Sequence, residues 1–143
     1  MKKPNKFAGL GLAVDKPFRL VLVWPVTNKP IKDKDGKESY VDVWSAESDV
    51  ARKYHRDLAQ RRIENGDAGP RSIEELEAAD ISRLAALTAD WYLVNPDGTP
   101  TDVPFSPDNA RDLYAAAATT WIKDQVENAT VQRRNFAPPL STN

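Results

Sequence analysis

In residues 40–44, which read YVDVW, valines alternate with aromatic and polar side chains. A repeat of period two is typical of a β-strand with one buried face, so the valines are expected on the inner side. Residues 18–24, FRLVLVW, are rich in β-branched and aromatic side chains and predict a second strand. The intervening Asp35-Gly36 pair is a hairpin signal. Together these segments predict an N-terminal β-hairpin over residues 18–45.

Helices are expected after the hairpin, because a two-stranded ribbon is marginally stable alone and needs a surface to pack on. Apolar residues recur every four positions from Val50 to Leu58, which is the spacing of one helix face. Ser72 and Ser106 are suited to cap two further helices. The predicted fold is therefore α+β and mainly α, an N-terminal β-hairpin followed by a small bundle of about four helices. The helices are expected at about residues 46–65, 72–93, 107–118 and 120–134.

The chain of 143 residues has the usual length of one domain. We expect residues 18–137 to form that domain, with a flexible basic arm over residues 1–17 and a flexible tail over residues 138–143. Charge is uneven, because residues 1–37 carry nine Lys or Arg against three Asp or Glu, whereas residues 67–114 carry three against ten. This distribution is typical of solvated faces, or of a basic arm that reaches an acidic partner or a second copy.

The chemistry available to the chain is limited. It has no cysteine and one histidine, His55, so the usual ligands of a transition metal are missing. Phosphate-binding and nucleophile motifs such as GxxxxGK[ST], GxGxxG and GxSxG do not occur. The segment 33–36, DKDG, is not followed by the glutamate that completes a calcium loop, and it predicts a hairpin turn. We therefore expect a protein that is not an enzyme and that binds no cofactor or metal.

Nucleic acid and membrane are poor candidates for the partner. The net charge is −1, so no global field attracts a polyanion. Basic residues cluster in 52–56 and at Arg61-Arg62, but they fall on several sides of the expected helix and are diluted by acids such as Asp57. No apolar run approaches the ~20 residues that span a bilayer. Asp80 interrupts the apolar face of the second helix, which indicates contact with water or with a partner.

Three stretches of the chain form a more specific pattern. The first is VDVWSAESD at residues 41–49, followed by Arg52 and Arg61-Arg62. The second runs from Trp91 through Asp97-Gly98 to VPFSPDNA at residues 103–110. The third is WIKDQV at residues 121–126, followed by an RxNF pattern that ends at Phe136. In this order the stretches resemble tail assembly chaperone-like proteins of long-tailed, siphophage-type bacteriophages, over about residues 40–137.

This resemblance implies a non-catalytic protein of the bacterial host cytoplasm that binds the phage tape measure protein and helps tail tube subunits assemble around it. A homo-oligomer is left open. A structural virion component, such as a tail-completion or connector protein, and a small nucleic-acid-binding protein are the alternatives. Aromatic side chains and arginine are enriched in binding hot spots, although the tryptophans also suit a core. The candidate protein-binding residues are Trp91, Phe105, Tyr114, Trp121, Ile122, Gln125, Arg133 and Phe136.

Overall fold

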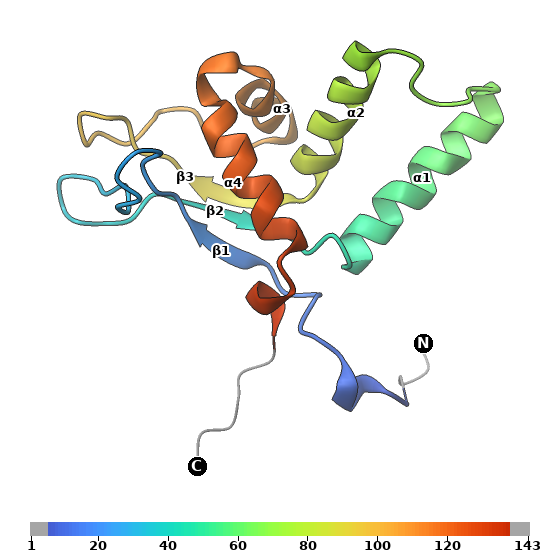
Figure 1. Cartoon of the computed structure of the whole chain (residues 1–143), viewed down its shortest axis with the longest axis horizontal. Helices are drawn as coiled ribbons and strands as arrows, with labels where there is room; N and C mark the ends of the chain where they lie inside the picture. The colour runs from blue at the N-terminus through green and yellow to red at the C-terminus, as the bar shows by residue number, and fades with distance from the viewer. Residues whose placement is uncertain (1–5, 138–143) are drawn as a thin grey trace.

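The computed structural model of the chain describes residues 6–137. The predicted tail at residues 138–143 and the first five residues of the predicted arm lie outside this range. Within it, the α+β, mainly α fold class predicted from the sequence is confirmed (Figure 1). The strands are β1 (Phe18–Val21), β2 (Tyr40–Val43) and β3 (Thr88–Tyr92), and the α-helices are α1 (Asp49–Asn65), α2 (Ile73–Ala86), α3 (Pro107–Ala115) and α4 (Thr120–Val131).

The strands form one antiparallel sheet in the order β1-β2-β3. β1 and β2 pair with Phe18 opposite Val43, which confirms the predicted hairpin. Val41 and Val43 are fully buried in the core, as the alternation predicts. The opposite face of the sheet carries polar side chains, and there the Arg19 guanidinium pairs with the Asp42 carboxylate at 2.9 Å.

The helix predicted over residues 72–93 is wrong in its C-terminal part, because α2 ends at Ala86 and β3 begins at Thr88. Thr88 and Trp91 have the β-branched and aromatic side chains that favour strands. The Thr88 hydroxyl donates to the Leu84 carbonyl at the end of the helix, at 2.8 Å. Pairing with β2 also gives partners to backbone groups that would otherwise form an open edge. Strand pairing therefore outweighs the helical spacing of the apolar residues.

The helix caps predicted at Ser72 and Ser106 are confirmed, whereas the first helix, expected from about residue 46, begins at Asp49. The hydroxyl oxygens of Ser48, Ser72 and Ser106 accept hydrogen bonds from the backbone N–H groups three residues later. The third and fourth helices are shorter than predicted, because 3₁₀ turns replace the α-helix in their last predicted residues. They end at Ala115 and Val131 and are followed by 3₁₀ turns at Ala117–Thr119 and Arg133–Phe136.

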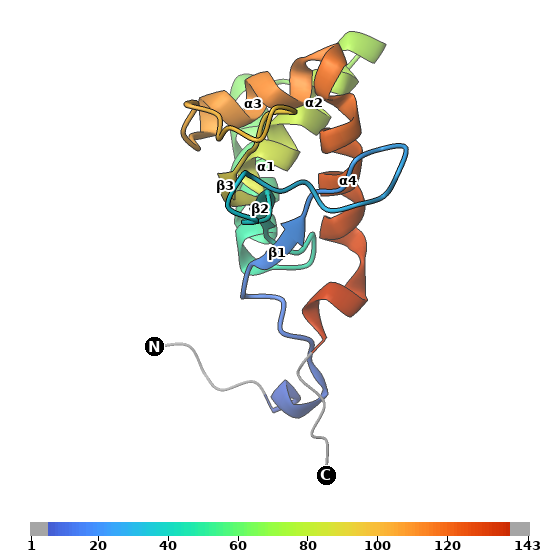
Figure 2. The same ribbon diagram turned by 90° about the vertical axis from the view of Figure 1, so that its left-hand side faces the viewer.

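Helices α2, α3 and α4 cover one face of the sheet, while α1 extends away from it (Figures 1 and 2). The core between the sheet and these three helices includes the fully buried Leu22, Leu84 and Val126. α1 contributes little to this core, and Ala51, in its first turn, is its buried residue. In residues 6–137 no helix combines the length and the apolar composition that crossing a membrane requires.

Part of the predicted flexible arm is held against the domain. The Ala13 N–H donates to the Phe136 carbonyl at 2.6 Å. A carboxylate oxygen of Asp15 accepts from the Asp49 N–H at 2.9 Å, and Val14 packs against the core. The flexible arm predicted over residues 1–17 is therefore too long, because its last residues find both polar and apolar partners.

Candidate functional site

The residues predicted to bind a partner lie mostly inside the fold. Trp91 lies on the inner face of β3 and is buried, and its indole N–H donates to the Val103 carbonyl at 3.2 Å. Phe105 packs edge-on against it, with ring centroids 5.4 Å apart. The two rings therefore fix the segment between β3 and α3 to the sheet, and Trp91 presents little surface to a partner.

Tyr114 and Ile122 are buried where α3 and α4 meet the core. The Tyr114 and Thr88 hydroxyl groups form a hydrogen bond of 2.7 Å. Burial raises the pKa of Tyr114 to about 12, because it outweighs the lowering effect of the bond with Thr88. The neutral phenol thus links α3 to the beginning of β3.

Two other predicted residues tie α4 to the chain that follows β1. The side-chain amide of Gln125 accepts from the Val23 N–H at 3.1 Å and donates to the Val23 carbonyl at 2.9 Å. One turn earlier, the Trp121 indole stacks on Trp24 with centroids 5.8 Å apart. Both side chains therefore join segments from opposite ends of the sequence.

Arg133 and Phe136 hold the end of the domain against its beginning. The Arg133 guanidinium donates two hydrogen bonds to the Glu47 carboxylate, at 2.8 and 3.1 Å, and these bonds lower the pKa of Glu47. Phe136 is buried and packs edge-on against Phe18, with a centroid distance of 6.0 Å. Contacts within the chain account for the RxNF pattern, and a role in binding stays a prediction.

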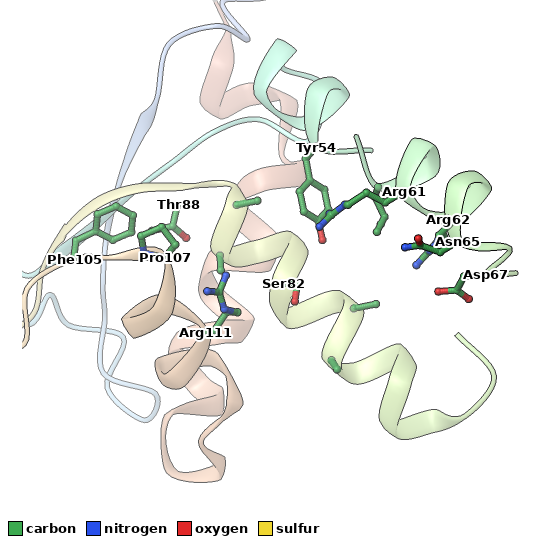
Figure 3. A pocket seen from close by; sticks show the side chains of 15 residues that line it. Tyr54, Arg61, Arg62, Asn65, Asp67, Ser82, Thr88, Phe105, Pro107 and Arg111 are labelled. Atoms are coloured by element: carbon green, nitrogen blue, oxygen red, sulfur yellow. The ribbon is translucent and has the colours of Figure 1, made fainter. Parts of the chain in front are cut away.

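The eight predicted residues do not converge on one surface, but a cleft lies between α1 and α2 (Figure 3). Its volume is about 800 Å³. α1 lines it with Tyr54, Leu58 and two arginines, and the segment at the beginning of α3 lines its end. Of the predicted site residues, Phe105 lines this cleft. The floor is formed by small side chains of α2, namely Ala78, Ala79, Ser82, Ala85 and Ala86.

The sequence around the cleft explains why it stays open. α1 leaves the sheet after the buried Ala51, and most of its later residues are exposed. Gly66 ends α1 in the left-handed conformation, with φ 64°, which favours glycine. α2 then runs back toward the sheet and turns its alanines toward α1. Because alanine and serine are short, they leave a space that larger side chains would fill.

The rim of the cleft is positively charged. Arg61 and Arg62 form no ion pair with any residue in the described part of the chain. Arg111 pairs with Asp108, and the lining acid Asp67 accepts a hydrogen bond from the loop that follows α1. Guanidinium groups without partners bind carboxylates strongly through paired hydrogen bonds. The cleft can therefore take an apolar segment that carries acids at its edge.

Several polar and aromatic groups near the cleft make contacts within the fold. The Thr88 hydroxyl is bonded to Leu84 and to Tyr114. His55 lies on an exposed face of α1 against the Tyr54 ring, with centroids 5.5 Å apart. Across residues 6–137, no group of three or more His, Cys, Asp or Glu side chains could hold a metal ion.

A second hollow of about 530 Å³ lies on the other side of α2, against the turn between α3 and α4. Ile73 and Leu76 line it with 71% and 59% of their surface exposed. Asp80 lies at its end and pairs with Arg83 at 2.7 Å and with Lys123 at 3.1 Å. Partial burial raises the pKa of Asp80, but the hydrogen bonds from Arg83 and Lys123 outweigh burial and keep it below its usual value.

Sequence patterns missed both hollows. The alanines of α2 follow helical spacing, which could have indicated a helix face suited to close packing. Arg61 and Arg62 stand out in the sequence as a basic pair, but the sequence does not show which surface they face. A scan of the chain against protein-family models found no match, and neither did searches of curated proteins and of solved structures. The function proposed below therefore rests on the sequence resemblance and on the geometry of the chain itself.

Proposed function

We propose that the chain is a non-catalytic, protein-binding protein of the phage tail assembly chaperone type. It binds the tape measure protein and assists assembly of the tail tube, in the cytoplasm of the bacterial host. The resemblance over residues 40–137 supports this biological role. The observation that carries the mode of binding is the cleft between α1 and α2, where the unpaired Arg61 and Arg62 border a floor of small side chains.

The floor of the cleft suits a helix of the client protein. Ala78 and Ser82 are short, so a second helix can approach α2 to a typical interaxial distance of about 8–10 Å. Its apolar side chains can then pack against Tyr54 and Leu58. A floor with few protruding side chains accepts many registers, which suits a chaperone that covers a long and varied helical client.

The rim of the cleft suits reversible binding. Arg61 is exposed, and ion pairs at exposed sites contribute only about 0.2–1 kcal/mol each. Several such contacts can hold a client in solution without trapping it. A chaperone has to release its client when the tail tube forms, and weak rim contacts allow that release.

Co-expression with the tape measure protein tests the proposal. The wild-type chain should increase the soluble fraction of the client and co-elute with it in size-exclusion chromatography. Ser82→Trp fills the floor of the cleft and should abolish co-elution. Asp124→Trp, which places the same side chain on an exposed position of α4, should leave co-elution unchanged.

Two results would overturn the proposal. One is a client whose solubility does not change with the wild-type chain and that forms no complex with it. The other is the chain itself in purified phage particles in stoichiometric amount, which would identify a structural virion component. Circular dichroism of both tryptophan variants should match the wild type, so that a lost complex reports on the cleft and not on folding.

A further inference from the structure

One side of α1 faces away from the cleft, toward solvent. Its residues Arg52, Arg56, Ala59 and Ile63 follow helical spacing and form a stripe that we call the α1 outer stripe. All four are exposed, and Ile63 has 76% of its surface in solvent. Neither arginine forms a salt bridge or side-chain hydrogen bond with another residue of the 6–137 range. This stripe thus combines unpaired positive charge with an exposed apolar side chain.

The hollow on the far side of α2 has the complementary character. We call Ile73, Leu76 and Glu77, together with Ala115 and Ala117, the α2 ledge. Its two large apolar side chains are mostly exposed. Glu77 forms no salt bridge or side-chain hydrogen bond with the described residues. Asp80, at the end of the ledge, is already paired with Arg83 and Lys123. The ledge thus combines unpaired negative charge with exposed apolar surface.

The two surfaces cannot meet within one chain. The α1 outer stripe is turned away from α2, since Tyr54 and Leu58 on the other side of α1 line the cleft. α2 itself separates α1 from the turn between α3 and α4 (Figure 1). One molecule therefore presents the α1 outer stripe and the α2 ledge in different directions. Each surface combines an unpaired charge with an exposed apolar patch, and the two charges have opposite sign.

We propose that the chain associates with a second copy of itself, with the α1 outer stripe of one copy on the α2 ledge of the other. Ile63 lies seven residues after Arg56, and Ile73 lies seven residues before Asp80. Both separations correspond to about 10.5 Å along a helix. An antiparallel alignment of the two helices therefore places Ile63 beside Ile73 when Arg56 lies beside Glu77 and Asp80.

This arrangement is a head-to-tail contact between copies. Each copy presents its stripe and its ledge in different directions, so a pair of copies leaves one stripe and one ledge exposed, to which further copies can add. The complementarity of charge favours a second copy, because both halves of the interface belong to the same sequence. The cleft lies on the other side of α1, so association does not occupy the surface assigned to the client.

Charge-reversal variants in sedimentation velocity experiments test this dimer. At low salt the wild type should dimerise, and Arg56→Glu and Glu77→Arg should each weaken the dimer at least about tenfold. An equimolar mixture of the two variants should restore dimers. In the mixture, the reversed stripe of one variant and the reversed ledge of the other carry opposite charges and attract, while the contact in the other order keeps its native pair. Arg134→Glu, a reversal at an exposed site on neither surface, should have no effect.

Three results would overturn the dimer. They are a wild type that stays monomeric up to about 1 mM, a dimer that neither reversal weakens, and variants that do not associate when mixed. None of these results concerns the cleft, since Ser82→Trp and client co-elution test that surface separately. Circular dichroism of each variant confirms that it is folded.

Discussion

The side-chain amide of Gln125 and the backbone of Val23 form a closed pair of hydrogen bonds across 102 residues of sequence. The Leu22 N–H donates to the Ser39 carbonyl, on the side of the chain that faces β2. Backbone groups of successive residues in an extended chain point to opposite sides, so those of Val23 point toward the outer edge of the sheet. The glutamine occupies the position that a neighbouring strand would take. α4 therefore completes the edge of the sheet in addition to covering its face.

Replacing Gln125 by alanine should destabilise the protein by about 1–3 kcal/mol, because the partly buried Val23 groups lose their partners. Urea unfolding of the variant measures this change. Gln132→Ala, just after α4, is the matched control, since among residues 6–137 its side-chain amide bonds to the exposed Asn128 alone. Its cost should be below about 0.5 kcal/mol. Equal costs for the two variants would contradict the role of the Gln125 pair.

Two tyrosines should ionise late in an alkaline titration. Burial raises the pKa of Tyr114, and the hydrogen bond to Asp33 raises that of Tyr92, each to about 12. Both values lie above the ordinary tyrosine pKa of about 10. Their contribution to stability is therefore complete below about pH 10 and is lost as the pH rises toward 12.

Ultraviolet absorbance of tyrosinate should place two of the four tyrosines in this late phase. Tyr114→Phe and Tyr92→Phe should each remove one tyrosine from it. A late phase that survives both substitutions would contradict the assignment.

Replacing Asp80 by asparagine should reduce the loss of stability in acid. Burial raises the pKa of Asp80, but the bonds from Arg83 and Lys123 hold it below its usual value. A lowered pKa gives stability that is present above about pH 4 and is lost as the pH falls through the folded-state value. The stability difference between wild type and Asp80→Asn should therefore shrink in acid.

Two leucines of α2 should respond very differently to truncation. Leu84 is fully buried, and Leu84→Ala should cost about 2–5 kcal/mol in the free energy of unfolding because it leaves a cavity. Leu76 is 59% exposed on the ledge, and Leu76→Ala should cost less than about 1 kcal/mol. Thermal and urea unfolding of both variants measure the contrast. Similar losses at the two positions would show that the ledge is part of the monomer core.

Local rules in the sequence predicted the hairpin and the helix starts. The serine caps at Ser72 and Ser106 depend only on residues within three positions, so a sequence pattern contains them. The alternation in residues 40–44 likewise fixes which side of β2 is buried.

The third strand could not be predicted in the same way. The spacing of Leu84, Leu87 and Trp91 fits a helix, and nothing near these residues identifies β2 as their partner. The choice between helix and strand is made by pairing with a segment far earlier in the chain. Propensity gives way to tertiary structure at such positions.

The site was predicted less well than the fold. Trp121 and Gln125 belong to a distinctive pattern, and their contacts with Trp24 and Val23 show that it serves packing between distant segments. The cleft depends on the direction in which α1 leaves the sheet. No periodicity of α1 or α2 alone encodes the angle between them.

The dependence of β2 on α4 has a consequence for synthesis of the protein. Val41 and Val43 share a core with Val126, which the ribosome adds near the end of translation. A nascent chain that stops before Thr120 therefore carries a hairpin whose inner side is incompletely covered, and such surfaces promote aggregation. The sheet is made early but becomes stable late, so premature termination yields material for proteolysis rather than a smaller working protein.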